Sequence, residues 1–293
     1  MLRTSAALAS LVFAFAAPAA LAQTSYVVDL TSNWTPGQAY HAAVSASEKA
    51  HTVVSIGGNK VQEQTQSRKV TLDADAKALD TFPHGGLRKA SLTLRTLRVS
   101  LNGAPETDFL PAGTKITAES TGETEKSFTV NEAPASPEQA SVLKLVIALD
   151  SEKHSDQILF GPKKPVAVGE TWTPDQALIQ KTLGKDLGKI ESTQATMRLD
   201  AVEGTGPARV SVVSGTVNFL GVQPALPPGV TPNPGTFKAV LDGRIPANRT
   251  ASKRIENLTA TADFSGEAPG PNGAKVLFTI NAEAKNATVL TFP

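Results

Sequence analysis

Cysteine is absent from this 293-residue sequence, and tryptophan and tyrosine occur only twice each. Without cysteine the chain can form no disulfide, no thiolate metal site and no lipid-modified cysteine anchor. Its stability therefore has to come from a hydrophobic core. The few tryptophans and tyrosines are also too scarce to form the aromatic girdles of membrane-spanning sheets.

The chain also has almost no net charge, because it contains 28 basic and 27 acidic residues. Proteins that bind nucleic acids need a basic face to neutralise phosphates. The balance therefore predicts no nucleic-acid partner. Beyond the N-terminus, no apolar run reaches the ~20 residues of a spanning helix. We therefore do not expect an integral membrane protein.

The N-terminus has the pattern of a secretory signal peptide. Residues 1–22 begin with a basic Arg3, continue through an apolar centre and end in Ala20-Leu21-Ala22, a typical cleavage site. The apolar centre is shorter than a spanning helix requires, which favours cleavage over a short membrane anchor. We therefore predict an exported protein, periplasmic or secreted after cleavage near Ala22.

The remainder of the chain is patterned mainly as β-strands. Residues 40–46 alternate apolar and polar side chains, as a half-buried strand does. Gly57-Gly58-Asn59 indicates a hairpin turn. Between Leu94 and Leu97 the alternation slips by one position, which predicts a β-bulge.

Two short helices are expected among these strands. Ser136 and Gln139 form the pattern of a capping box, with proline at the first helical position, so we predict a helix over residues 137–149. The apolar run at residues 145–149 also fits a buried strand. Thr173 followed by Pro174 predicts a second helix over residues 174–183.

Two segments bear on domain organisation. Residues 160–178 divide two β-patterned parts, so residues 23–293 form a single β-rich domain or two β lobes joined at residues 160–178. The pattern Trp-Thr-Pro-x-Gln-Ala occurs at residues 34–39 and 172–177, which either duplication or coincidence explains. The proline-rich residues 223–235 predict an extended surface loop, a spacer rather than a lid or recognition loop.

The sequence contains no motif for nucleophilic catalysis, phosphate binding or dinucleotide binding, and no His-Glu-x-x-His metal motif. Asp150, Glu152 and Asp156 could together bind a cation, but the segment lacks the glycine of a calcium loop and contains Lys153. A solvated loop is therefore favoured. No metal or cofactor is predicted.

Other polar residues have ordinary explanations alongside functional ones. His84 and His154 would serve a hydrolase only through a site assembled from distant segments, and a turn position is favoured for His84. A basic strand carries Arg88, Lys89, Arg95 and Arg98; it protects a sheet surface or binds an anion. Glycosylation sequons begin at the following positions: Asn33, Asn248, Asn257 and Asn286.

The pattern Pro-x-x-Pro-Val-x-Val-Gly-x-x-Trp at residues 162–172, with Pro-Gly-Gln-Ala-Tyr at residues 36–40, resembles an uncharacterised family of secreted bacterial β proteins with a Val-Gly-x-x-Trp motif. That family is similar to LolA and LppX lipoprotein carriers. The resemblance implies a mainly β fold: a curved antiparallel sheet, an unclosed half-barrel, with one or two short helices covering its concave face. It also implies an apolar ligand in the concavity and no catalytic residue.

The predicted function is that of an exported, non-catalytic binding protein for a lipid, an acyl chain or another apolar ligand. The alternatives are a cell-envelope interaction module without a small ligand and a hydrolase with an unrecognised site. Alternating aliphatic and aromatic residues on the inner face are the expected ligand contacts, although such residues also form ordinary cores. They are Val70, Leu72, Leu92, Leu94, Phe128 and Val130.

Overall fold

The computed structural model describes residues 24–31, 33–121, 125–153, 155–184, 187–226, 229–247, 253–270 and 273–293. The predicted signal peptide at residues 1–22 lies outside the described residues, as do His154 and Asn248.

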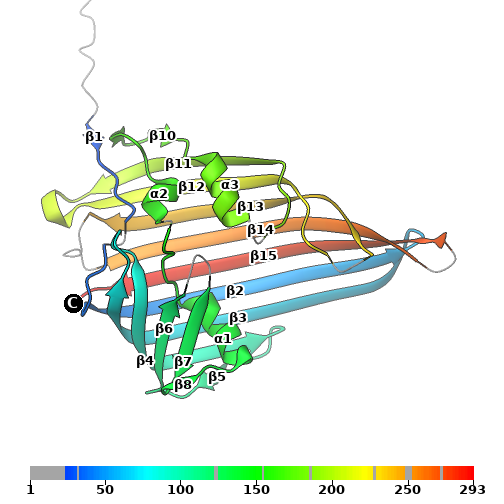
Figure 1. Ribbon diagram of the computed structural model, residues 1–293, viewed down its shortest axis with the longest axis horizontal. Coiled ribbons are helices and arrows are strands. Elements are labelled where there is room, and N and C mark those ends of the chain that lie inside the picture. The colour runs from blue at the N-terminus through cyan, green and yellow to red at the C-terminus, as the bar shows by residue number, and fades with distance from the viewer. Residues whose placement is uncertain are drawn as a thin grey trace, which may run out of the picture.

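One antiparallel sheet of thirteen strands dominates the described part of the chain (Figure 1). Its order is β10-β11-β12-β13-β14-β15-β2-β3-β4-β6-β7-β8, and β5 pairs with β4. The five longest strands are adjacent: β13 (Thr231–Pro246), β14 (Lys253–Pro269), β15 (Lys275–Thr291), β2 (Ala39–Ile56) and β3 (Asn59–Thr81).

Shorter strands continue the sheet on both sides of these five. On one side lie β12 (Val210–Val222), β11 (Ser192–Glu203) and β10 (Thr171–Trp172). On the other lie β4 (Leu87–Leu101), β5 (Thr107–Leu110), β6 (Lys115–Ser120), β7 (Lys126–Val130) and β8 (Ala133–Pro134). A separate pair consists of β1 (Ser25–Tyr26) and β9 (Val166–Ala167).

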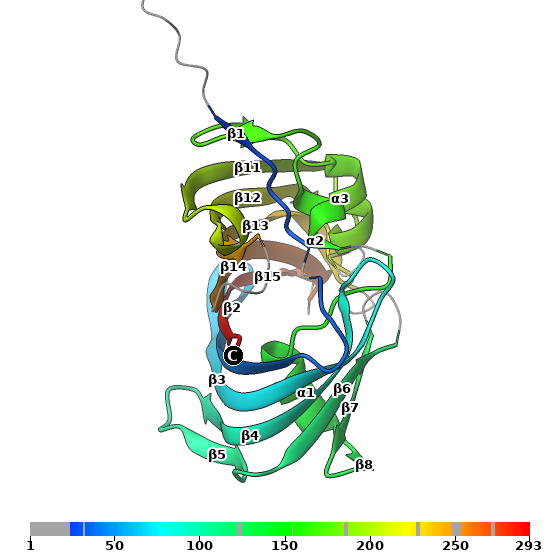
Figure 2. The same ribbon diagram turned by 90° about the vertical axis from the view of Figure 1, so that its left-hand side faces the viewer.

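The sheet is strongly curved and stays open. Viewed nearly along the strands, it bends around a hollow, and α1 (Pro137–Val146), α2 (Asp156–Phe160) and α3 (Gln176–Leu183) lie on its concave side (Figure 2). The predicted fold class, mainly β with a curved, unclosed antiparallel sheet, is therefore confirmed. None of the helices in the described part of the chain combines the length and hydrophobicity that crossing a membrane requires.

Two hydrophobic clusters line the concave side. The first, here called the α1 core, packs α1 against β2, β3, β4, β6 and β7, and it includes the fully buried Leu97, Ile116 and Leu143. The second, the α3 core, packs α2 and α3 against β11 and β12, and it includes Ile179 and Phe219. The two cores lie at opposite flanks of one sheet, which leaves the central strands β14 and β15 between them.

Helix α1 forms where the capping box predicts it. The Ser136 Oγ atom accepts a hydrogen bond from the Gln139 backbone N–H at 3.2 Å, and the Gln139 side chain accepts one from the Ser136 N–H at 2.9 Å. The helix ends at Val146 rather than at residue 149, because Ile147 is extended, with φ −112° and ψ 106°. Residues 147–155 then connect α1 to α2, a short helix that the sequence did not indicate.

The repeated Trp-Thr-Pro-x-Gln-Ala pattern adopts two different structures. In the first copy Gly37 has φ 90°, a left-handed conformation that turns the chain into β2. In the second copy Asp175 replaces that glycine and caps α3 by accepting a hydrogen bond from the Leu178 N–H at 3.0 Å. The second helix therefore begins at Gln176, and the predicted start at Pro174 was wrong.

Turn and bulge predictions are confirmed in the long strands. Gly57 and Gly58, both with positive φ, form the β2–β3 hairpin, and the β3–β4 register shifts beside Leu94. Residues 231–235, however, belong to β13, and residues 231–233 pair with β14, so the predicted loop was too long. Pro232 and Pro234 are tolerated there because β12 pairs with β13 only up to Gly235.

We predict that Ser136→Ala lowers the free energy of unfolding by about 1 kcal/mol, since it removes the acceptor of an N-cap hydrogen bond. Ser136→Thr keeps the hydroxyl and should lose much less. Urea unfolding followed by circular dichroism measures both. Equal losses in the two variants would show that the cap does not stabilise α1.

Candidate functional site

The concave face of the central strands carries a continuous patch of alanines. Ala260 pairs with Ala284 across β14 and β15, Ala262 pairs with Ala282, and Ala282 also pairs with Ala50 of β2. All five line one open groove, and we call them the alanine floor. They continue, at every second residue, the face that Ala42, Val44 and Ala46 bury under α1.

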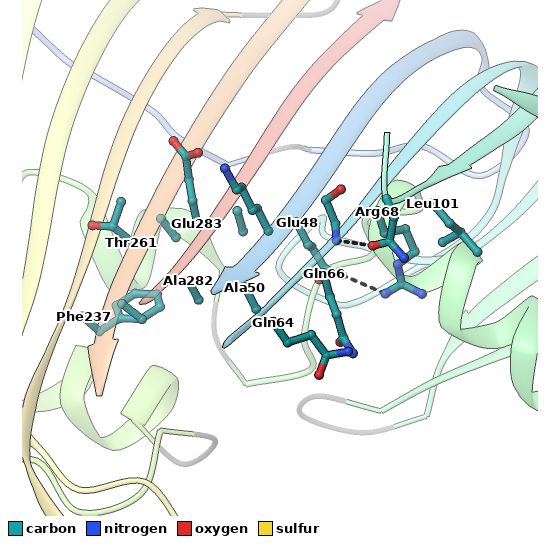
Figure 3. A pocket seen from close by; sticks show the side chains of 16 residues that line it. Glu48, Ala50, Gln64, Gln66, Arg68, Leu101, Phe237, Thr261, Ala282 and Glu283 are labelled. Carbon is teal, nitrogen blue, oxygen red and sulfur yellow. Dashed lines mark hydrogen bonds and ion pairs between the residues drawn. The ribbon is translucent and has the colours of Figure 1, made fainter. Parts of the chain in front are cut away.

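The groove above the alanine floor has a volume of about 560 Å³. Figure 3 shows Ala50 and Ala282 between Phe237 on one side and Arg68 and Leu101 on the other. The Arg68 guanidinium is held by Glu48 at 2.8 Å and donates a hydrogen bond to the Ser141 Oγ at 3.0 Å. One wall is therefore aromatic, and the other combines an aliphatic side chain, an ion pair and the polar side chains of Gln64 and Gln66.

Alanine is an unusual choice for the middle of a sheet, because it is depleted in strands relative to β-branched and aromatic residues. Here its small side chain leaves depth between the walls. The floor is apolar, but no helix of the described chain covers it as α1 covers the neighbouring positions. The groove thus offers open apolar surface to a ligand.

Two further cavities lie along the same strands as the groove. One, of about 360 Å³, lies between the two cores, and we call it the intercore cavity. The other, of about 200 Å³, lies deeper, against the α1 core, and shares residues 146–148 with the intercore cavity. On β14 the cavities follow one another from Arg254 through Leu258 to Ala262. At ~3.3 Å per residue this trough is roughly 26 Å long.

The predicted ligand contacts lie beside this trough. Leu72 and Leu92 line the 200 Å³ cavity. Val70, Leu94 and Phe128 are buried in the α1 core, and Val130 is partly buried against it. The contribution of these six side chains to binding stays a prediction. The alanine floor was missed, although the alternating alanines of β14 and β15 are visible in the sequence.

A charged cluster lies at the inner end of the trough. Arg254 is 7 % exposed, and its Nε donates to Glu256 Oε1 at 2.7 Å. Asp156, the first residue of α2, lies 3.7 Å from the same guanidinium. Asp150 accepts a hydrogen bond from the Leu87 N–H. Of the predicted solvated loop, Asp150 is only partly exposed, whereas Asp156 keeps an exposed side chain beside Arg254.

Asp156 faces the cavity rather than packed side chains, so its side chain keeps 51 % of its accessible surface. Desolvation by the surrounding protein, together with the charge of Glu256, raises the pKa of Asp156 to about 6, although Arg254 opposes the shift. Desolvation likewise raises the pKa of Asp150. In the described part of the chain, no group of three or more His, Cys, Asp or Glu side chains is arranged to hold a metal ion.

His84 uses both ring nitrogens in its turn. Nδ1 accepts a hydrogen bond from the Gly86 N–H at 3.2 Å, and Nε2 lies 3.0 Å from the Ser151 carbonyl oxygen. The ring also stacks on Phe82. These contacts fit a structural role in the connection to residues 150–151.

The basic strand is neutralised on the convex face. Arg95 donates to Asp75 at 2.8 Å, and Arg98 donates to Asp108 at 3.0 Å. Arg88 and Lys89 both pair with Glu119. These carboxylates occupy the basic side chains of the strand and would compete with an anionic ligand for them.

The sequons within the described residues have engaged side chains. The Asn286 amide donates to the Leu145 carbonyl at 3.0 Å and lines the intercore cavity. The Asn257 amide donates to Asp242 at 2.8 Å on the convex face. Asn33 has φ 39° and lies 3.4 Å from Asp29.

Comparisons with known proteins show no close relative. No protein-family model matches the sequence, and no curated protein matches it significantly. Among solved structures, lipovitellin aligns with 86 % of this chain at 8 % identity and a TM-score of 0.28, and the chain spans about a quarter (25 %) of lipovitellin. The outer membrane protein OprG of Pseudomonas aeruginosa aligns with 89 % of this chain and 99 % of its own at 7 % identity and a TM-score of 0.18. At these scores the similarities carry no argument.

We predict that Asp156 titrates near pH 6 and that Glu256→Gln lowers its pKa, because the variant removes a neighbouring negative charge. Carboxyl-carbon NMR titration measures both values, with Glu48→Gln as a remote control. The folded-state pKa exceeds the ~3.9 of an unfolded chain. Asp156 therefore stabilises the fold most below about pH 4, and this contribution is lost as the pH rises through about 6. An unshifted titration would refute the environment described for Asp156.

Proposed function

We propose that this protein is a non-catalytic binding protein that holds the acyl chain of a lipid, or a similar apolar ligand, in the trough of its curved sheet. The observation that carries the proposal is the alanine floor: apolar, concave and left open by the helices that cover the adjoining positions. Its volume of about 560 Å³ falls in the usual range of ligand pockets, roughly 300–1,000 Å³.

The dimensions of the trough support an elongated ligand. The hydrocarbon core of a bilayer is ~30 Å thick, so one leaflet, and one acyl chain, spans about 15 Å. A trough roughly 26 Å long therefore holds a complete chain. Burial of apolar surface contributes about 25 cal/mol per Å², which favours transfer of the chain from water to the floor.

The predicted export of the chain fits this proposal. An apolar ligand that crosses an aqueous compartment outside the cytoplasm needs a sheltered site, and a periplasmic or secreted binding protein provides one. The binding itself requires no cofactor and no catalytic group.

The first test is native mass spectrometry of protein purified without detergent. We expect a bound lipid or other apolar molecule that is released by organic solvent. A bare polypeptide mass, combined with no uptake of added long-chain lipid, would contradict the proposal and favour the cell-envelope interaction module.

The second test fills the groove. Ala282→Trp places an indole at the centre of the alanine floor and should weaken binding of the uncharged fluorophore N-phenyl-1-naphthylamine by about tenfold or more, the equivalent of ~1.4 kcal/mol. Thr259→Trp is the matched control, because Thr259 has the opposite strand parity on neighbouring β14 and does not line the groove. Equal affinities in the two variants would place the ligand elsewhere.

A further inference from the structure

We propose that the ligand carries an anionic head group, a carboxylate or a phosphate, and that Lys126 and Lys144 hold it in the intercore cavity. This inference rests on the proposed function, because it assigns the polar end of the same ligand. Both lysines line the intercore cavity, from β7 and from the last turn of α1.

Neither lysine has an acidic partner. Lys126 Nζ donates one hydrogen bond, to the Ile147 carbonyl oxygen at 3.1 Å. An ammonium group has three donors, so two are left for a ligand. Throughout the part of the chain that the structure describes, no carboxylate lies within 4 Å of the Nζ atom of Lys126 or Lys144.

Burial makes the charged form of Lys126 costly. Desolvation lowers the pKa of Lys126, the charge of Asp150 opposes this effect, and the charge of Lys144 lowers the pKa by a smaller amount. The partial negative charge at the C-terminal end of α1 stabilises part of the positive charge of the two lysines. A bound anion would satisfy the free donors and offset the desolvation of Lys126, which is how partly buried charges are normally stabilised.

The acidic groups on the far wall of the cavity do not neutralise the two lysines. Glu256 and Asp156 lie on that wall beside Arg254, which binds Glu256. Apolar side chains from the α3 core and β14 line the same cavity: Leu30, Phe160, Met197, Leu241, Ile245 and Leu258. A chain therefore passes over apolar surface while its head meets the lysines.

The test compares three twelve-carbon probes: dodecanoate, dodecyl phosphate and the uncharged dodecanol. Each displaces N-phenyl-1-naphthylamine from the full-length protein at constant ionic strength. We expect at least one anionic probe to bind about tenfold tighter than dodecanol, the equivalent of one charge-assisted contact. The stronger of the two anions identifies the head group as a carboxylate or a phosphate.

The variant Lys126→Met/Lys144→Met should abolish this preference and leave the affinity for dodecanol within about twofold of the wild type. Lys181→Met is the matched control, because Lys181 is also in the last turn of a helix, α3, and does not line the cavity. Lys126→Arg/Lys144→Arg keeps both charges and should retain the preference. If the double methionine variant does not fold, Lys144→Met alone, at an exposed position, should reduce the preference.

The outcomes separate the two proposals. Equal binding of all three probes by the wild type would overturn the anionic head group and leave the apolar trough intact. A preference that survives both Lys126→Met/Lys144→Met and Lys144→Met would overturn the assignment to these lysines. Binding of none of the probes would overturn the proposed function itself.

Discussion

The pairing of β15 with β2 is the interaction on which the rest of the structure depends. It joins the last strand of the chain to the first long one, from Val276 opposite Ile56 to Thr291 opposite His41, without a register shift. Because side chains alternate between faces with a period of two, an unbroken register keeps every second residue on the concave side. The two cores, built from different parts of the chain, thereby share one continuous floor.

The alanines of that floor represent a compromise between stability and space. Larger β-branched side chains would suit the strands better, and they occur where α1 closes over the sheet, as at Val44 and Val70. Between the cores the chain instead has Ala260 and Ala282, which contribute little packing but leave the groove deep. The α1 and α3 cores supply the apolar burial that the floor lacks, so the open region is supported from both sides.

The charged residues of the convex face of the sheet differ from those of the concave face. On the convex side, basic and acidic residues form exposed pairs such as Arg95 with Asp75, which add little stability individually. On the concave side, desolvation by the surrounding protein shifts the pKa values of Asp156 and Lys126 in opposite directions. Both shifts disfavour the charged form, as burial does.

The sequence by itself determined the local features: the mainly β character, the Gly57-Gly58 hairpin, the bulge beside Leu94 and the capping box at Ser136. Each of these features depends on residues close together in the chain, so the spacing of those residues was sufficient to predict it. It did not predict α2, which has only five residues and too little periodicity to recognise. Only the tertiary structure decided that the alanines of β2, β14 and β15 meet in one floor, that Arg254 meets Asp156, and that Lys126 meets the end of α1. These contacts join segments distant in the chain, and strand pairing over such distances leaves no periodic signal in the sequence.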